Sequence, residues 1–94
     1  MKKPVIKERD VLRQVRDYLT HKNFFVYRNH QSLGSHKGLS DLTAIKGGRV
    51  LWIEIKKPGG KLSDYQKAFR DAINMHGGEY YVIDCLDCIM ALEP

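Results

Sequence analysis

The sequence lacks any long apolar run. Charged or polar residues interrupt every apolar stretch well before the roughly 18 residues that a membrane-spanning helix needs, and no apolar segment follows the basic start of the chain. We therefore expect a cytoplasmic protein with no membrane span and no signal peptide. Repeats and low-complexity segments are also lacking, and 94 residues are enough for one small hydrophobic core. We expect a single domain over residues 1–94.

Cysteine is scarce, with only Cys85 and Cys88 in the whole chain. A CxxC pair can act as a redox dithiol or as half of a zinc site. A four-ligand zinc site would need partners, however, and the sequence has neither a second CxxC nor a closely spaced histidine pair. The interpretation we favour is a pair of ordinary buried thiols. A zinc-bound interaction domain built on these cysteines and His76 stays an alternative.

Negative charge is in short supply, since 16 Lys+Arg stand against 11 Asp+Glu and the net charge is +5. The excess is local, because residues 1–16 and 46–61 each carry a net charge of +4 whereas residues 62–94 carry −4. The two basic stretches could give a polyanion the phosphate contacts that supply most sequence-independent affinity. The charge pattern therefore indicates a nucleic-acid partner, with a solvated basic surface as the alternative.

Residues 7–21 have the apolar spacing of an amphipathic helix. Glu8 breaks this pattern, because it stands four residues before Leu12 and seven before Val15, on or beside the apolar stripe. A carboxylate in that position is costly to bury unless a positive charge meets it. Glu8 is thus either a carboxylate that meets a positive group or a solvated first-turn residue that favours the helix dipole.

Three segments rich in β-branched and aromatic residues predict strands, at residues 24–28, 40–45 and 50–56. Residues 29–38 contain two glycines, two serines and two histidines, which is typical of a loop. We therefore expect a strand, a polar loop and then two strands close together in the sequence.

A Gly-Gly pair at residues 47–48 predicts a two-residue hairpin turn between the last two of these strands. In that register Asp41 faces Glu54. Because side chains alternate along a strand, Asp41, Glu54 and Lys56 share one face. The opposite face carries an apolar set that must belong to the core: Leu42, Ala44, Leu51, Ile53 and Ile55.

Asp41 and Glu54 form the most informative pair of the hairpin. Directly opposed side chains have Cβ atoms about 4.5–5.5 Å apart, and like charges there destabilise the pair. Two such carboxylates make an oxygen-rich site for a hard divalent ion such as Mg²⁺. Lys56 emerges on the same face about 7 Å beyond Glu54, where it could hold an attacking water or stabilise charge on a phosphate. The alternative is an ordinary solvated face in which Lys56 pairs diagonally with Asp41.

A second helix is predicted to begin near Ser63, because Ser63 and Gln66 match a capping box. Gln66 either only caps this helix or, by its spacing from the apolar residues that follow, points inward toward the hairpin. The rest of the chain predicts a glycine stop at residues 77–78, a strand at 79–83 and a short helix at 86–92 that Asp84 could cap.

The predicted order is helix, three strands, helix, strand and helix, an α/β fold with a mixed four-stranded sheet. With Glu8, Asp41, residues 54–56 and Gln66 placed on this order, the sequence resembles the VRR-NUC family of the PD-(D/E)XK nuclease superfamily. The resemblance covers almost the whole chain and implies a restriction-endonuclease-like α-β-β-β-α-β core with a short C-terminal helix. It rests on residues 38–42 (GLSDL), 52–56 (WIEIK), 61–66 (KLSDYQ) and 77–82 (GGEYYV).

The resemblance implies metal-dependent hydrolysis of DNA phosphodiester bonds, with Mg²⁺ as the cofactor and Mn²⁺ able to replace it. Asp41, Glu54 and the backbone carbonyl of Ile55 would bind the metal, and Glu8 would act through a metal-bound water. Lys56 would position the nucleophilic water. Gln66 matches the helix glutamine that orders this arrangement.

The partner implied by charge and resemblance together is DNA. Basic side chains would hold its backbone and shape rather than its sequence. Because a short chain has little surface for recognition, we expect a homodimer, and small members of the family resemble resolvases of branched DNA such as four-way (Holliday) junctions, which act in DNA repair. The rival interpretation is a non-catalytic basic nucleic-acid-binding module with a decayed nuclease site. The candidates for DNA contact are Lys7, Arg9, Arg28, Lys37, Lys46, Arg49, Lys57 and Lys61, with Lys2, Lys3, Arg13 and Arg16 on the same basic flank.

Overall fold

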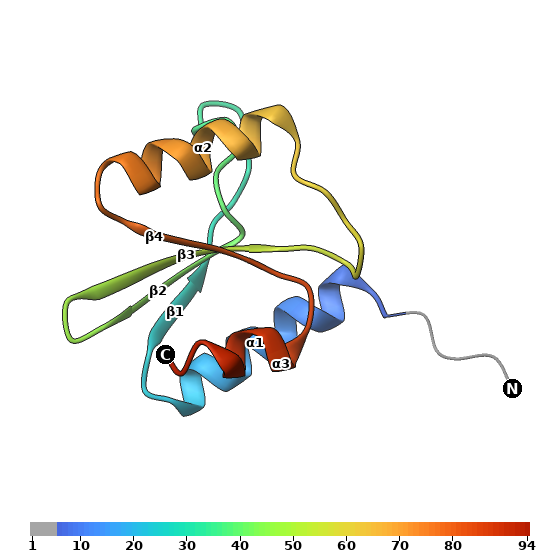
Figure 1. Ribbon diagram of the computed structural model, residues 1–94, viewed down its shortest axis with the longest axis vertical. Helices are drawn as coiled ribbons and strands as arrows, with labels where there is room; N and C mark the ends of the chain where they lie inside the picture. The colour runs from blue at the N-terminus through green and yellow to red at the C-terminus, as the bar shows by residue number, and fades with distance from the viewer. Residues whose placement is uncertain (1–5) are drawn as a thin grey trace, which may run out of the picture.

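The structure is a computed structural model that describes residues 6–94, and it consists of a four-stranded sheet between two layers of helices (Figure 1). Lys2 and Lys3 of the expected basic flank lie outside the described residues. The predicted α/β order is confirmed, with bounds that differ by one or two residues. The elements are α1 (Glu8–His21), β1 (Phe25–Arg28), β2 (Leu42–Lys46), β3 (Arg49–Ile55), α2 (Asp64–Met75), β4 (Glu79–Ile83) and α3 (Leu86–Ala91).

The sheet is mixed, as predicted, with the strands in the order β1-β2-β3-β4. β1, β2 and β3 pair antiparallel, whereas β3 and β4 pair parallel. The hairpin pairs Lys46 with Arg49 and Leu42 with Ile53, which is the register expected from a two-residue turn. Both turn glycines lie in the left-handed region, with φ of 59° and 82°, as a type I′ turn requires.

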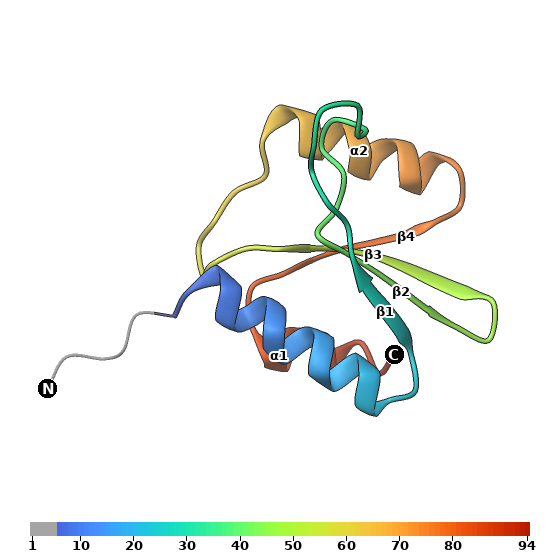
Figure 2. The ribbon, with the colours of Figure 1, turned by 180° about the vertical axis from the view of Figure 1, so that it is seen from behind.

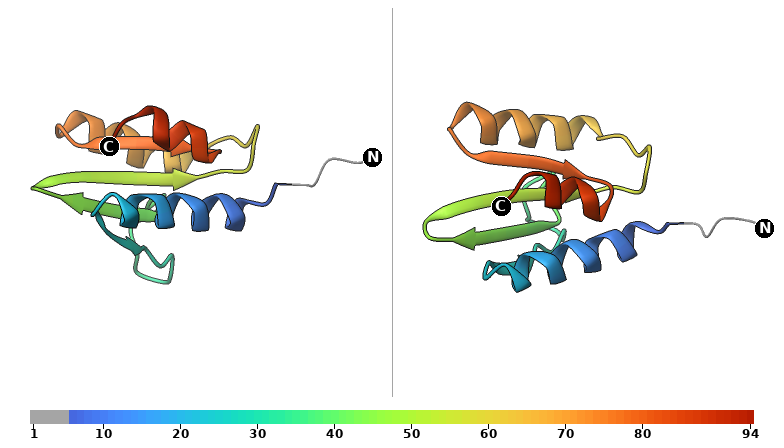
Figure 3. Two further views of the ribbon diagram at one scale, coloured as in Figure 1. Left: turned by 90° about the horizontal axis from the view of Figure 1, so that it is seen from below. Right: turned by 60° about the horizontal axis from the view of Figure 1, so that its bottom comes forward.

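One face of the sheet is covered by α1 and α3 and holds the hydrophobic core (Figure 3). α1 buries Val11, Val15 and Leu19 along one stripe, and α3 adds Ile89. The apolar face predicted for the hairpin is confirmed, because all of its residues are fully buried: Leu42, Ala44, Leu51, Ile53 and Ile55.

The other face of the sheet is covered by α2, which lies opposite α1 and α3 (Figure 2). The predicted capping box is present: Ser63 Oγ accepts a hydrogen bond from Gln66 N at 3.2 Å, and Gln66 Oε1 accepts one from Ser63 N at 2.8 Å. Phe69 of α2 is buried and packs edge to face against Tyr80 of β4, with ring centroids 6.1 Å apart. This contact holds α2 against the sheet.

The loop over residues 29–41 extends from β1 to the start of α2 and returns to β2 (Figures 1 and 2). Gly38 is buried where the loop meets α2 and has φ of 80°. A Cβ at this position would collide with the backbone carbonyl of Tyr65. Only glycine allows this approach, so Gly38 helps to place Asp41, three residues later, beneath the start of α2.

Two expectations about the C-terminal segment are wrong. Asp84 does not cap α3; the N-cap is Cys85, whose Sγ accepts a hydrogen bond from Cys88 N at 3.2 Å. Cys85 and Cys88 are not ordinary thiols but form a disulfide, because the CxxC turn brings their Cα atoms to 5.4 Å, within bridging range. His76 is the C-cap residue of α2 and is not part of the group that Asp84 and the two cysteines form. No helix in residues 6–94 is long and apolar enough to span a membrane.

Candidate active site

Glu54 is a buried carboxylate on the face of β3 that α2 covers. It is 2 % exposed, and β3 lies between β2 and β4 in the sheet. The residues on either side of Glu54, Ile53 and Ile55, belong to the core on the opposite face. Glu54 Oε1 accepts a hydrogen bond from Gln66 Nε2 at 2.8 Å. Glu54 Oε2 is buried and has no hydrogen-bond partner within residues 6–94. The fold therefore leaves one carboxylate oxygen without compensation, which is costly in a protein interior.

Asp41 ends the loop before β2, and its carboxylate extends across to β3. Asp41 Oδ2 accepts a hydrogen bond from the backbone N–H of Ile55 at 2.7 Å. The backbone ladder between β2 and β3 ends at the pair Leu42–Ile53, so the side chain of Asp41 provides the next acceptor for β3. The hairpin thus makes Asp41 and Glu54 electrostatic neighbours, and the charge of Asp41 contributes to a raised pKa of Glu54.

Asn29 holds the backbone on either side of Asp41. Its backbone N–H donates to Asp41 O at 2.8 Å, and its side-chain Nδ2 donates to Ser40 O at 3.1 Å and to Thr43 Oγ1 at 2.9 Å. Sequence reasoning missed Asn29, because its partners are 11 to 14 residues away and no local pattern marks it. Through Asn29 the polar loop therefore holds the backbone that carries Asp41.

Gln66 connects α2 to the site, because it caps the helix and also points inward toward the hairpin, so the alternative that it only caps is wrong. Its Oε1 caps the helix through Ser63 N and also accepts a hydrogen bond from Lys56 Nζ at 2.9 Å. Its Nε2 donates to Glu54. Lys56 Nζ lies 3.8 Å from Glu54 Oε1, and the Lys56 side chain is 16 % exposed. The ion-pair partner of Lys56 is therefore Glu54, and the expected alternative of a diagonal pair with Asp41 is not observed.

Burial and the nearby carboxylates work against the ionisation of Glu54. Burial raises the pKa of Glu54 to about 8, and the negative charge of Asp41 adds to this rise. Lys56 opposes the rise, and Glu8 makes a smaller contribution to it. Glu8 is exposed at the start of α1.

These residues fit a divalent cation. Carboxylate oxygens are the ligands that Mg²⁺ prefers, and the buried Oε2 of Glu54 has no other partner within residues 6–94. A positive charge between Asp41 and Glu54 would favour the ionised form of both groups and remove their repulsion. Ile55 follows Glu54 at the end of β3, so its backbone carbonyl is a candidate for a third oxygen ligand.

Tyr80 is a polar residue of this face that sequence reasoning did not single out. Its hydroxyl is buried and has no hydrogen-bond partner within the described part of the chain. Burial raises the pKa of Tyr80, and the charges of Glu54 and Asp41 raise it further, so the phenol stays neutral. A partial signal was present, because Tyr80 pairs with Trp52 across the parallel strands and therefore shares the face of Glu54.

The candidate DNA-contacting residues divide between the two ends of the sheet. Lys46 and Arg49 flank the hairpin turn. Glu54 stands five positions after Arg49 on the strand, about 17 Å away at 3.3 Å per residue. Arg49 donates to both carboxylate oxygens of Glu79 at 2.9 Å, and Lys46 Nζ donates to a backbone carbonyl at 2.9 Å. The remaining candidates are exposed and belong to the segments that carry or adjoin Glu8, Asp41 and Lys56: Lys7, Arg9, Arg28, Lys37, Lys57 and Lys61.

Comparisons with known proteins identify the family and the fold. Residues 7–85 match the family model of the VRR-NUC domain. A solved structure described as a VRR_NUC domain has a TM-score of 0.81 to this chain at 17 % sequence identity, and the match covers 90 % of this chain and 91 % of the other. At this identity the match shows the fold alone. No curated protein matches the sequence.

Proposed function

Because this chain belongs to the VRR-NUC family, a family of nucleases, we propose that it is a metal-dependent endonuclease that hydrolyses phosphodiester bonds of DNA. The observation that carries the proposal is the buried Oε2 of Glu54, which has no partner within residues 6–94 and lies beside a second carboxylate. Two neighbouring carboxylates, one of them buried, destabilise the fold. A bound cation would neutralise them, which explains why the fold contains the pair. We take residues 1–94 as one nuclease domain.

The metal-binding residues in this proposal are Asp41, Glu54 and the carbonyl of Ile55, with Glu8 acting through a bound water. When bound, Mg²⁺ or Mn²⁺ polarises a phosphoryl oxygen and neutralises developing charge. Asp41 is held for this role by Ile55 N and by Asn29. Gln66 fixes the orientation of the Glu54 carboxylate through one oxygen and leaves the other free to bind the ion.

Lys56 is the residue that we assign to the nucleophile. Its ammonium donates one hydrogen bond to Gln66 Oε1 and carries three donors in all. A remaining N–H can orient an attacking water toward the phosphorus or stabilise charge on a phosphoryl oxygen. Because Gln66 contacts both Lys56 and Glu54, the nucleophile-positioning group and a metal ligand are held by one side chain.

The DNA in this proposal lies across the exposed basic residues near the site. Lys7 and Arg9 flank Glu8, Lys57 follows Lys56, and Lys37 lies over the ring of Tyr65 at 4.8 Å. Contacts from such residues reach phosphates, so they give affinity and position without sequence preference. Lys46 and Arg49 lie at the other end of β3 and would contact only a longer stretch of the same DNA.

The substrate that we propose is branched DNA, such as a four-way junction, cut by a homodimer in DNA repair. An apolar patch on edge strand β1 supports the dimer: Phe25 and Tyr27 are 67 % and 42 % exposed, with ring centroids 5.6 Å apart. Phe25 of β1 pairs with Ile45 of β2, whose side chain is half-buried. Two copies that meet through this patch would bring two sites to one junction. A purely monomeric protein by light scattering, with and without DNA, would contradict the dimer.

The proposal is tested by cleavage of single-stranded, duplex, flap and four-way DNA with and without Mg²⁺. We expect Mg²⁺-dependent cutting that Glu54→Gln and Lys56→Ala abolish, while both variants keep DNA binding. Binding without cutting by the unmutated protein would favour the alternative of a non-catalytic nucleic-acid-binding module. Equal cutting of plain duplex and four-way DNA at physiological salt would contradict the branched substrate but not the nuclease.

A further inference from the structure

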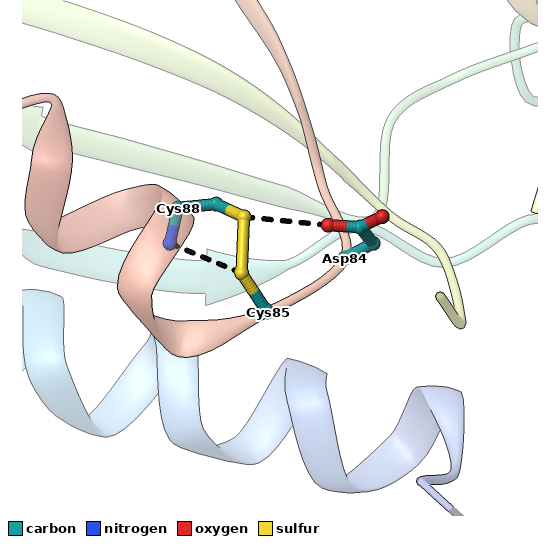
Figure 4. Close-up of side chains that lie close together, drawn as sticks. All are labelled: Asp84, Cys85 and Cys88. Atoms are coloured by element: carbon teal, nitrogen blue, oxygen red, sulfur yellow. Dashed lines mark hydrogen bonds between the residues drawn. A yellow bond between two sulfur atoms is a disulfide. The ribbon is translucent and has the colours of Figure 1, made fainter. Parts of the chain in front are cut away.

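The segment that follows β4 carries a chemical group that the nuclease site does not use. Asp84, Cys85 and Cys88 lie together at the start of α3, with the two sulfur atoms bonded and the Asp84 carboxylate beside them (Figure 4). α3 covers the face of the sheet opposite the one that holds Glu54 (Figure 3). We propose that Cys85 and Cys88 form a thiol–disulfide exchange site, which a low-molecular-weight thiol or its disulfide reversibly reduces and oxidises.

The two cysteines differ in access. Cys85 lines a groove of about 580 Å³ between α1 and the start of α3, together with Asp10, Arg13 and Asp84. Cys88 does not line this groove and packs against the hydrophobic core instead. The volume lies within the range of small-molecule sites. A small thiolate in the groove therefore meets Cys85 before Cys88.

The two sulfur atoms also differ in their polar surroundings. Asp84 Oδ1 lies 3.3 Å from Cys88 Sγ, whereas Cys85 Sγ accepts a hydrogen bond from the backbone N–H of Cys88 at 3.2 Å. A disulfide sulfur carries no proton, so the contact between Asp84 and Cys88 becomes a hydrogen bond only when the pair is reduced. The carboxylate then holds Cys88 as a protonated thiol, while the backbone N–H favours negative charge on Cys85.

Because only Cys85 lines the groove, access assigns the roles in the exchange. An external thiolate attacks Cys85 Sγ, the bond between the two sulfurs breaks, and Cys88 leaves as a thiolate that takes a proton from water. The Cys88 thiol then donates a hydrogen bond to Asp84. A second external thiolate attacks the external sulfur of the mixed disulfide, which releases Cys85 as the thiol and the external pair as its disulfide. Two thiols are thereby oxidised for each protein disulfide reduced, and the reverse sequence restores the protein disulfide.

The test is a titration of the full chain in glutathione buffers, followed by alkylation and mass measurement. We expect a single reversible transition from no alkylated cysteine to two. In Cys88→Ser, Cys85 should form a mixed disulfide with glutathione at least about tenfold faster than Cys88 does in Cys85→Ser, because only Cys85 faces the groove. Asp84→Asn removes the charged acceptor of the Cys88 thiol and so destabilises the reduced pair. The ratio of reduced to oxidised glutathione at the midpoint of the titration should therefore rise about fivefold in this variant.

Three results would overturn the proposal. The pair could stay bonded in the folded protein at every buffer ratio, which would make it a permanent crosslink. The two single variants could form the mixed disulfide at equal rates, which would remove the distinction between the two sulfurs. About one zinc ion per chain, with both cysteines protected from alkylation, would assign the same three residues to a metal instead. The titration of the unmutated chain decides the first result, and metal analysis of the same protein decides the third, without relying on any variant.

Discussion

Glu54 should make the metal-free protein less stable as the pH rises. Burial and the charge of Asp41 raise its pKa from 4.5 to about 8. The folded protein therefore binds this proton more tightly than the unfolded chain does. A raised carboxyl pKa contributes stability at low pH that is lost as the pH rises through the folded pKa. At about 1.4 kcal/mol per pH unit over most of this window, the loss between pH 5 and pH 8 is on the order of 3 kcal/mol, a large share of the ~5–15 kcal/mol total.

The variant Glu54→Gln should remove this dependence. A neutral amide at this position can still accept the hydrogen bond from Gln66 Nε2, and it can donate toward Asp41 as a protonated Glu54 would. We expect the variant to be more stable than the unmutated protein at pH 8 by about 2–3 kcal/mol and nearly equal to it at pH 5. Urea unfolding in the presence of a chelator at several pH values measures both free energies.

The difference between the two proteins isolates Glu54, because every other ionisable residue is the same in both. Glu79→Gln is the matched control: a hydrogen bond from Arg49 and a second from Tyr81 lower the pKa of Glu79, so its contribution is complete above the ordinary carboxyl range and is lost only in acid. This control should keep the slope between pH 5 and pH 8. The free energy of unfolding of Glu54→Gln could still fall between pH 5 and pH 8, or that of the unmutated protein could stay constant. Either result would mean that burial does not raise the pKa of Glu54.

Three further predictions concern the metal, the loop and the helix glutamine. Mg²⁺ at about 100 times its dissociation constant should stabilise the unmutated protein by about 2.7 kcal/mol in thermal or urea unfolding, and no stabilisation would contradict a metal site. Gly38→Ala should cost at least about 1 kcal/mol more than Gly34→Ala, since both have positive φ but only Gly38 meets the Tyr65 carbonyl; equal costs by urea unfolding would contradict the contact. Gln66→Leu should reduce cutting by at least about tenfold, whereas Ser63→Ala should lose about 1 kcal/mol of stability and keep cutting. Loss of cutting in Ser63→Ala would mean that helix capping alone sustains the site.

The hairpin was predictable because its signals are local. A Gly-Gly turn flanked by alternating residues defines the register and separates the core face from the face of Glu54, and both features hold in the structure. The capping box of Ser63 and Gln66 was equally local, since its two hydrogen bonds close within one helical turn. Patterns of this kind depend on neighbours in the sequence, so they need no knowledge of how the elements pack.

The rest of the site depends on how distant elements meet. Gln66 contacts Glu54 and Lys56 only because the first turn of α2 lies against the end of β3. Spacing within the helix allowed an inward-pointing Gln66 but does not reveal which residues it meets. Arg49 counted as a basic residue for DNA, yet Glu79, 30 residues away, holds its guanidinium. Asn29 sits in a loop whose composition indicates only flexibility, but its hydrogen bonds fix the backbone at Asp41.

The position of Glu54 on β3 explains how the fold tolerates a buried carboxylate whose Oε2 has no partner within residues 6–94. Ile53 and Ile55, its neighbours on the strand, are fully buried on the opposite face, and each contributes about 1.5–3 kcal/mol relative to an exposed side chain. Side-chain alternation thus gives the same strand a strongly stabilising face and a destabilising one. The backbone that holds Glu54 is anchored by residues that never contact the site, so the carboxylate cannot relieve its burial by moving to solvent. The metal-binding role that we propose for Glu54 requires this rigidity, because a ligand free to move away would lose the geometry that Gln66 and Asp41 impose.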